Sequence, residues 1–332
     1  MPLREELEKH ELERLSPYAA KSALSRGRKR PEEKCPLRTD FQRDRDRITH
    51  AKSFRRLMHK TQVFIAPEGD HYRTRLTHTL EVTQIARTIA RALGLNEDLT
   101  EAIALGHDLG HTPFGHTGED ALDRILPGGF RHNEQSVRVV ETLEKGGAGL
   151  NLCFEVIDGI LCHRGGLKPL TLEGAAVQIS DKIAYINHDT DDAVRSGIIR
   201  GSDLPAECRE ILGDTPHDRI NTLIHSVIAE SAGKPRVSLG AEQFAALYRL
   251  RDFLFENVYR SQIFERSKIK HMLEEIFAYY SRNPAELPED YLKLAAREGD
   301  NARVICDYIA GMTDRFALNL FARIYMPSAW GV

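Results

Sequence analysis

Apolar residues recur every three or four positions over most of this chain, which is the spacing of one face of an α-helix. The clearest run stops at Gly94 and consists of Leu80, Val82, Ile85, Ala86, Ile89, Ala90 and Leu93. Asn96 then supplies a helix cap, followed by an acidic first turn. This second helix carries the dipeptide His107-Asp108 near its end, and we expect it to stop at Gly110.

The same spacing continues towards the carboxyl end and predicts further helices. They cover residues 173–199, 218–231, 241–258, 269–280 and 303–324. A strand or hairpin is expected over residues 60–73, where three apolar residues precede Pro67 and Gly69. No internal repeat, coiled-coil heptad or low-complexity tract is present in the sequence. We therefore predict an all-α fold.

Composition and charge are those of an ordinary globular protein. Hydrophobic residues make up 41% and charged residues 29% of the chain, and the net charge is only -3, so no whole-molecule attraction to nucleic acid or anionic lipid is indicated. The five cysteines are scattered without C-x-x-C spacing, which favours reduced thiols in a cytoplasm. Because neither a signal peptide nor a run of about 18 apolar residues is found, we expect a soluble cytoplasmic protein with no membrane partner.

Basic side chains are dense between residues 21 and 47. We interpret this segment as an extended, partly mobile arm whose charges are solvated. The alternative is an arm that reaches a polyphosphate or a single-stranded nucleic acid.

Four side chains from three predicted helices suggest a metal site. His107 and Asp108 project about 100° apart on a helix, so they can bind one ion only at its flank. His78 begins one predicted helix, and Asp181 lies within another, among apolar residues where a carboxylate is costly unless it is paired or bound to metal. The alternative for Asp181 is a salt bridge to Lys182. Together these nitrogen and oxygen ligands suit one divalent cation with positions left for water and phosphate oxygen.

Histidines are concentrated between residues 78 and 132, around the predicted ligands and the glycine-rich loops that follow them. Five of the 14 histidines of the chain lie there: His78, His107, His111, His116 and His132. If a helix starts near Thr117, the carboxylate of Glu119 can orient the His116 imidazole above the metal. The alternative is a T-x-x-D helix cap that needs no Glu119. His111 either orients Asp108 or fills the turn.

Six segments of the sequence carry a resemblance to a known family. They are Q-R-D-R-D-R-I (42–48), F-R-R-L (54–57), K-T-Q-V (60–63), G-H-D-L-G-H-T-P-F-G-H-T-G-E (106–119), S-D-K-I-A-Y (180–185) and D-Y-I-A-G-M-T-D-R-F-A (307–317). With the four metal-ligand candidates, the chain resembles the HD phosphohydrolase superfamily and, more closely, the deoxyguanosine triphosphate triphosphohydrolase-like family.

This resemblance implies hydrolysis of a 2'-deoxynucleoside triphosphate (dNTP) to the deoxynucleoside and tripolyphosphate. It also implies an HD-domain helical fold: a basic N-terminal arm over residues 1–49, a metal-dependent phosphohydrolase core over 50–200, and additional C-terminal helices over 201–332. The ion would be Mn, Fe, Co, Ni or Mg, with Mg also accompanying the triphosphate. A homo-oligomer is expected, and a dNTP effector or single-stranded nucleic acid is a further candidate partner.

The resemblance places the catalytic pair on His116 and Glu119. It matches Arg75, one turn before His78, to a phosphate-binding arginine. His132 matches a second-loop histidine that contacts phosphate, the alternative being a helix cap. The acid or base role of His116 is left open by the sequence.

Further substrate contacts are expected around Asp181. Lys182 follows this ligand directly, and its ammonium group suits the negative charge of a polyphosphate. The alternative interpretation is that Lys182 is a solvated surface residue. Tyr185 and Asp189 follow at four-residue intervals on the same helix face. By resemblance Tyr185 packs on the deoxyribose, and Asp189 with Gln62 holds the 3'-hydroxyl; the alternative for Tyr185 is core packing.

Two other functions remain open from the sequence. One is an HD phosphohydrolase acting on nucleoside monophosphates or cyclic nucleotides. The other is a single-stranded nucleic-acid binder with a vestigial HD site. The carboxy-terminal motif predicts no chemistry; it contains Tyr308, Gly311, Met312 and Arg315. We expect it either to close over the base or to brace a subunit contact.

Overall fold

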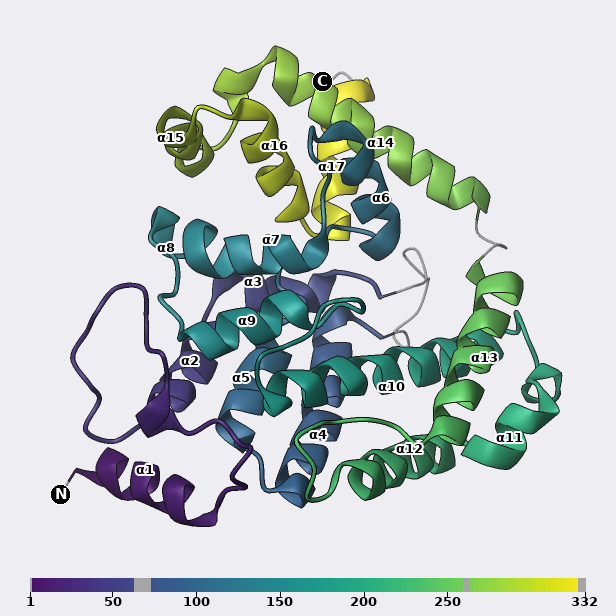
Figure 1. The fold of residues 1–332 in the computed structure, drawn as a ribbon. Helices are drawn as coiled ribbons and strands as arrows, with labels where there is room; N and C mark the ends of the chain where they lie inside the picture. Colours follow the sequence, from purple (N-terminus) through teal and green to yellow (C-terminus); the bar gives the residue numbers. More distant parts are fainter. Residues whose placement is uncertain (1, 63–72, 260–262, 328–332) are drawn as a thin grey trace. The chain divides into compact units, whose positions relative to one another are not determined.

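The computed structural model describes residues 2–62, 73–259 and 263–327, and the chain folds into two compact units (Figure 1). Unit 1 consists of Met1–His50, His78–His107 and Asn151–Ile263, and unit 2 of Ala51–Thr77, Asp108–Leu150 and Phe264–Val332. Over the described residues the structure is helical, with two isolated β-bridges and no strand. The predicted all-α class is confirmed, whereas the division at residues 49/50 and 200/201 stays a prediction.

Unit 1 is built mainly from long helices. Its elements are α1 (Leu3–Arg14), η1 (Ser22–Leu24), α2 (Asp40–Thr49), α4 (Arg75–Leu93, which begins in unit 2), α5 (Glu97–Gly106), α9 (Phe154–Cys162), α10 (Leu172–Arg195), η4 (Gly201–Asp203), α11 (Ala206–Leu212), α12 (Pro216–Ser231) and α13 (Ala241–Asn257). None of the helices in the described parts of the chain is sufficiently long and apolar to span a lipid bilayer.

The apolar helix α5 lies at the centre of unit 1, where it packs against α2, α9 and α10. Its start follows the predicted signal, because the Asn96 side chain accepts a hydrogen bond from the Leu99 backbone N–H. Its end differs from the prediction: α5 stops at Gly106, and residues 107–110 form a turn. His107 and Asp108 therefore follow the helix instead of lying within it.

Unit 2 has its own core. Its elements are α3 (Lys52–Arg56), η2 (Leu57–His59), α6 (Gly115–Ile125), α7 (His132–Arg138), the π-helix η3 (Val139–Leu143), α8 (Glu144–Gly147), α14 (Ile263–Arg282), η6 (Pro284–Glu286), α15 (Glu289–Glu298), α16 (Asn301–Ala310) and α17 (Asp314–Tyr325). Buried apolar residues of α6, α14, α15, α16 and α17 form one cluster. This cluster anchors α6, which carries His116 and Glu119.

The helix predicted over residues 303–324 is two helices, so that prediction is wrong. α16 ends at Ala310, and the Thr313 side chain caps α17 by accepting a hydrogen bond from the Phe316 N–H. Both helices bury apolar residues in the same cluster, which is why the apolar spacing runs across the break.

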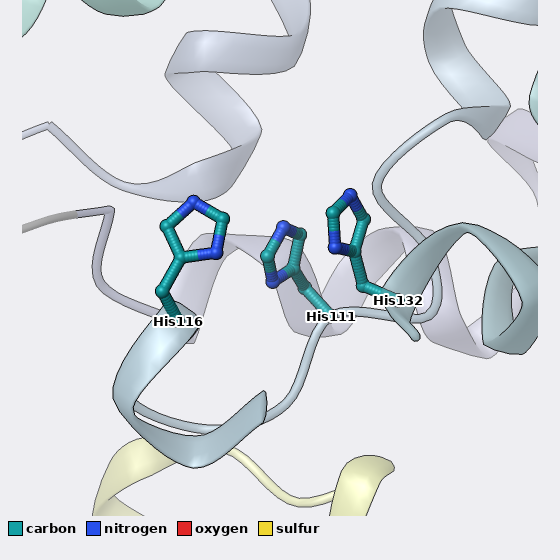
Figure 2. Close-up of side chains that lie close together, drawn as sticks. All are labelled: His111, His116 and His132. Atoms are coloured by element: carbon teal, nitrogen blue, oxygen red, sulfur yellow. The ribbon is translucent and has the colours of Figure 1, made fainter. Parts of the chain in front are cut away.

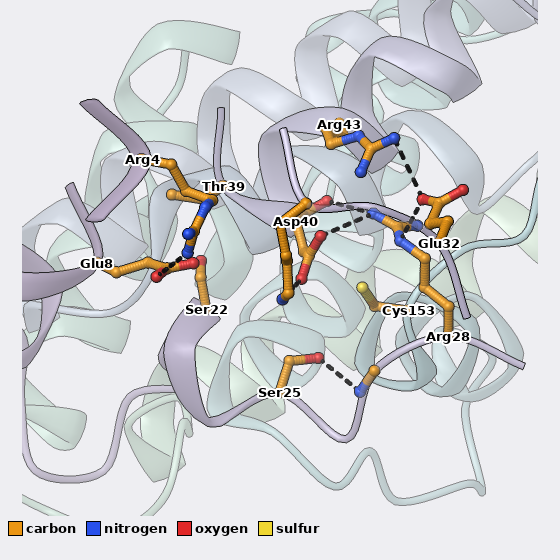
Figure 3. A network of polar contacts seen from close by, with 12 residues as sticks. Arg4, Glu8, Ser22, Ser25, Arg28, Glu32, Thr39, Asp40, Arg43 and Cys153 are labelled. Atoms are coloured by element: carbon orange, nitrogen blue, oxygen red, sulfur yellow. Dashed lines mark hydrogen bonds and ion pairs between the residues drawn. The ribbon is translucent and has the colours of Figure 1, made fainter. Parts of the chain in front are cut away.

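The basic amino-terminal segment, which is part of unit 1, is held together by ion pairs between its own residues (Figure 3). The Arg28 side chain is 5% exposed, and it contacts Glu32 at 2.9 Å and pairs with Asp40 and Asp44. Asp44 in turn accepts a hydrogen bond from the Cys153 N–H at 2.6 Å. The expectation of a solvated arm is therefore wrong for Arg28, because its guanidinium is buried and paired with two buried carboxylates.

Most of the hairpin predicted over residues 60–73 lies outside the described residues. Next to that stretch, Thr61 and Thr74 form an isolated antiparallel bridge.

A buried carboxyl group makes the stability of unit 1 depend on pH. Glu173 is fully buried, and its Oε1 accepts hydrogen bonds from the backbone N–H groups of Ala20 and Asn96, at 3.0 and 2.9 Å. Burial raises the pKa of Glu173 from 4.5 to about 7 despite these hydrogen bonds. The folded state therefore retains the proton to a higher pH than the unfolded state does.

We predict that the free energy of unfolding falls as pH rises from about 4.5 to about 7, by roughly 3 kcal/mol at about 1.4 kcal/mol per pKa unit. Glu173→Gln retains the accepting oxygen and should remove this part of the decline. Urea unfolding followed by circular dichroism at pH 5 and pH 8 measures it. Glu97→Gln is the control, because the Arg91 side chain lowers the pKa of Glu97. An equally steep decline in Glu173→Gln would contradict the assignment.

Candidate functional site

Three of the four predicted metal ligands converge within unit 1. His78 lies in the first turn of α4, His107 directly after α5, and Asp181 in α10. His78 Nε2 is 3.1 Å from Asp181 Oδ1, and His107 Nε2 is 3.9 Å from the same oxygen. One ring nitrogen of His78 also lies within 4.8 Å of one ring nitrogen of His107. The cluster gathers two imidazoles and a carboxylate at ligand spacing.

The tautomer of His107 is set by the backbone. Its Nδ1 is 2.6 Å from the Ala104 carbonyl oxygen, which can only accept, so Nδ1 carries the hydrogen. In the neutral ring Nε2 then holds the lone pair, on the side of Asp181. An imidazole whose second nitrogen is fixed by a carbonyl is the usual form of a metal-binding histidine. His107 therefore fits a divalent cation.

Asp181 remains ionised in this cluster. Burial alone would raise its pKa, but the hydrogen bond with His78 and the nearby imidazoles of His107 and His163 lower the pKa to about 2. The alternative salt bridge to Lys182 is not present, because the Lys182 ammonium group donates to the Tyr248 hydroxyl at 3.4 Å. A carboxylate surrounded by imidazoles is suited to bind a cation.

The fourth predicted ligand, Asp108, follows His107 in the chain and belongs to unit 2. Its Oδ2 accepts a hydrogen bond from Arg75 at 2.8 Å, and both side chains are almost fully buried. His111 Nε2 lies 3.4 Å from Asp108 Oδ1, so the expectation that His111 orients Asp108 agrees with the geometry. Arg75, expected to bind phosphate, contacts a carboxylate here.

A second cluster in unit 2 centres on Glu119. Glu119 Oε2 lies 3.1 Å from His116 Nδ1, and Oε1 accepts from the backbone N–H and ring Nδ1 of His132, both at 3.0 Å. Although burial would raise the pKa of Glu119, the hydrogen bonds with His116 and His132 hold it far below its usual range. Both rings therefore donate through Nδ1, and the arrangement expected for His116 and Glu119 is present.

The helix that carries this pair begins earlier than predicted. α6 starts at Gly115, with Phe114 as its cap residue, so the T-x-x-D cap from Thr117 does not exist. His132 is the first residue of α7, after the cap position at Arg131, so it is not a helix cap. The structural alternatives for Glu119 and His132 are therefore wrong.

His111, His116 and His132 lie side by side (Figure 2). His111 and His132 are stacked, with ring centroids 4.1 Å apart and planes 13° from parallel. A metal ion lies near the plane of each imidazole that binds it, so two stacked rings cannot share one ion in this arrangement. Burial, together with the charge of Arg75, lowers the pKa of His111 well below its usual value and keeps it neutral.

The loop before α6 lies against Arg75. Gly115 has φ +55°, and a Cβ there would lie 2.7 Å from Arg75 Nη2 and 3.0 Å from the Gln62 carbonyl oxygen. Only glycine combines this backbone with this approach. The loop is thus fixed next to the guanidinium that holds Asp108.

The remaining predicted substrate contacts fall in both units. In unit 1, Tyr185 is half-buried, and burial next to Asp181 raises the pKa of its hydroxyl. Asp189 is buried and accepts a hydrogen bond from the Tyr259 hydroxyl. In unit 2, Gln62 Oε1 is buried and has no hydrogen-bond partner within the described stretches of the chain. The substrate roles of these residues stay predictions.

Several residues near these side chains were not singled out in the sequence. His188 contacts Glu81 at 2.7 Å, and its ring centroid lies 5.7 Å from that of His78. His188 stands seven positions after Asp181, so the helix-face reasoning applied to Tyr185 could have found it. His163 lies 5.0 Å from His107 between ring centroids, but its position after α9 gives no local signal. The Arg251 guanidinium lies 4.5 Å from the centre of the Tyr248 ring, a contact between positions i and i+3 of α13 that the sequence spacing could have indicated.

Comparison with known proteins gives similarities over the whole chain. The HD domain family matches residues 75–186, and the phosphohydrolase-associated domain matches residues 237–323. Proteins named deoxyguanosinetriphosphate triphosphohydrolase-like protein are 61% identical in Caldanaerobacter subterraneus, 48% in Desulfatibacillum aliphaticivorans and 52% in Clostridium perfringens. The alignments cover 98–99% of this chain and 98–99% of the relatives.

We predict that Arg75→Ala lowers the free energy of unfolding by about 3–5 kcal/mol, because it leaves the buried Asp108 carboxylate without its cation. Urea unfolding of the metal-free protein measures this loss. In a double-mutant cycle, Arg75→Ala with Asp108→Ala should cost less than the sum of the single changes. Arg266→Ala, which removes only a hydrogen bond to the Thr117 hydroxyl, is the control and should cost about 1 kcal/mol. Strictly additive losses would exclude a stabilising pair.

Proposed function

Because this chain belongs to the deoxyguanosinetriphosphate triphosphohydrolase-like family of HD-domain proteins, we propose that it is a metal-dependent dNTP triphosphohydrolase. The reaction would release the deoxynucleoside and intact tripolyphosphate. The observation that carries the proposal is the convergence of His78, His107 and Asp181, with the His107 lone pair directed by the Ala104 carbonyl.

We propose His78, His107, Asp108 and Asp181 as the ligands of one divalent ion. His78, His107 and Asp181 form the cluster in unit 1. Asp108 follows His107 directly in the chain. Such an ion, of Mn, Fe, Co, Ni or Mg, would neutralise charge on phosphate oxygens and lower the pKa of a bound water. In addition, a Mg ion would accompany the triphosphate.

We propose His116 as the residue that exchanges a proton during cleavage. Its side chain is 66% exposed, and Glu119 fixes its Nδ1, which leaves Nε2 for the substrate or for water. The contact with the buried Glu119 carboxylate also holds the His116 ring in one orientation. His132 shares the same carboxylate and would contact a phosphate through its other nitrogen.

The remaining roles concern substrate recognition. Lys182 and Arg75 would contribute positive charge for the polyphosphate, Tyr185 would pack on the deoxyribose, and Asp189 and Gln62 would bind the 3'-hydroxyl. Lys182 supports this assignment because, over the described stretches, its ammonium forms no ion pair and only a 3.4 Å hydrogen bond to Tyr248. Assembly into a homo-oligomer, a dNTP effector, single-stranded nucleic-acid binding and cytoplasmic location stay predictions.

Product analysis tests the reaction. Purified protein incubated with each dNTP and divalent ion should release tripolyphosphate, resolved by anion-exchange chromatography. Release of orthophosphate from a nucleoside monophosphate, or opening of a cyclic nucleotide, with no tripolyphosphate from any dNTP would favour the alternative phosphohydrolase.

We predict that Asp181→Ala loses bound metal and lowers turnover by more than about 100-fold, because the carboxylate is a ligand. The helices should remain, since α4, α5 and α10 each pack through buried apolar residues. Elemental analysis, turnover and circular dichroism measure the three effects. Asp120→Ala is the control, since Asp120 forms an exposed ion pair with Lys270. Full metal content in Asp181→Ala would refute its role as a ligand.

Tyr185→Ala is predicted to weaken selection against ribonucleotides by roughly ten-fold or more, because the ring would no longer exclude a 2'-hydroxyl. Tyr185→Phe keeps the ring and should retain selection. The measurement is the ratio of kcat/KM for a dNTP and its ribonucleotide in a competition assay. An unchanged ratio in Tyr185→Ala would leave the tyrosine as a core residue only.

A further inference from the structure

The loop that leads to His116 has an unusual backbone. Phe114 has φ 59° and ψ 27°, the left-handed conformation that side chains other than glycine rarely adopt. Gly115 follows with φ +55°, and His116 is the next residue. Because the Phe114 ring is buried in the core of unit 2, this conformation determines the direction in which α6 begins. An external contact is needed to hold a costly backbone in place.

That contact comes from Asp314, about 200 residues later in the sequence. Asp314 Oδ1 accepts a hydrogen bond from the Phe114 N–H at 2.9 Å. Oδ2 accepts from the Thr61 N–H at 3.0 Å and from the Thr61 hydroxyl at 2.6 Å. The carboxyl group is buried, and three donors from two distant segments satisfy it.

Helix capping does not account for this arrangement. Asp314 is the first residue of α17, where an acid commonly serves the helix dipole from an exposed position. Here Thr313 provides the cap by accepting from the Phe316 N–H, and the Asp314 carboxylate bonds to Phe114 and Thr61 instead. The side chain therefore serves the loop rather than its own helix.

Lys60 holds the same loop at its other end. It is buried, and its ammonium group donates to the carbonyl oxygens of His111 and Ala310, the latter at 2.8 Å. Burial lowers the pKa of Lys60 to about 7, while nearby Asp314 opposes that shift. The loop from His111 to Phe114 is thus fixed at its first carbonyl and at its last N–H.

We propose that Asp314 is a positioning residue, which holds Phe114 in the left-handed conformation and thereby sets where His116 and Glu119 lie. The inference rests on the proposed function, in which these two residues act on the substrate. It assigns a task to the carboxy-terminal motif at 307–317, because Asp314 of this motif fixes the loop that carries the groups proposed to act on the substrate.

The test compares Asp314→Ala and Asp314→Asn with Asp300→Ala in the full-length protein. Asp300 caps α16 in the same unit by accepting from the Arg303 N–H at 2.9 Å, and it has no contact with the loop. All three variants should lower Tm. Only the Asp314 variants should also lower kcat, by about ten- to a hundred-fold for alanine and less for asparagine, with a smaller change in KM.

Hydrogen exchange of the Phe114 amide provides a readout that does not depend on turnover. Asp314→Ala should accelerate this exchange, whereas Asp300→Ala should not. Faster exchange without tripolyphosphate release by the wild-type protein would mean that the contact exists but the proposed function fails. A kcat within two-fold of wild type in folded Asp314→Ala, or unchanged exchange at Phe114 in that variant, would overturn the positioning role. If Asp314→Ala does not fold, Asp314→Leu, which is close to aspartate in size and accepts no hydrogen bond, is judged by the same limits.

Discussion

The candidate site depends on burying carboxylates next to imidazole and guanidinium groups. Asp108 and Glu119 are buried, Asp181 keeps 21% of its side chain exposed, and each carboxylate has nitrogen partners at hydrogen-bond or ion-pair distance. A buried carboxylate without such partners would take up a proton. Because the partners keep Asp181 and Glu119 ionised, one can serve a cation and the other can hold two histidine rings in a fixed tautomer.

The backbone completes this arrangement. The Ala104 carbonyl fixes His107, as the Ile160 carbonyl fixes His163 at 2.7 Å, so in both rings Nε2 is the nitrogen with the lone pair. At Phe114 and Gly115 the backbone takes the left-handed conformation where α6 begins. The side chains therefore supply the nitrogen and oxygen atoms of the candidate site, whereas main-chain groups set how those side chains are oriented. The amino-acid composition gives no information on this orientation.

Local patterns predicted the helices and the groups that meet through one helix. The cap at Asn96, the stop at Gly94 and the Asp181–Tyr185 spacing could be read directly because each depends on neighbours in the sequence. The division of residues 303–324 into two helices was missed, since both halves bury the same face. Partners far apart in sequence, such as Arg75 with Asp108 or Asp314 with Phe114, could not be predicted because packing alone brings them together.

The interleaving of the two units has a consequence for the order in which the protein is made. Unit 1 lacks its last helices until residue 263 has been synthesised, and the core around α6 includes α14, α16 and α17, the last segments of the chain. A ribosome therefore releases α6 long before the helices that cover its apolar side exist. A nascent chain stopped after α13 would carry the residues of the HD match but would leave Phe114 and Leu122 without most of their core neighbours.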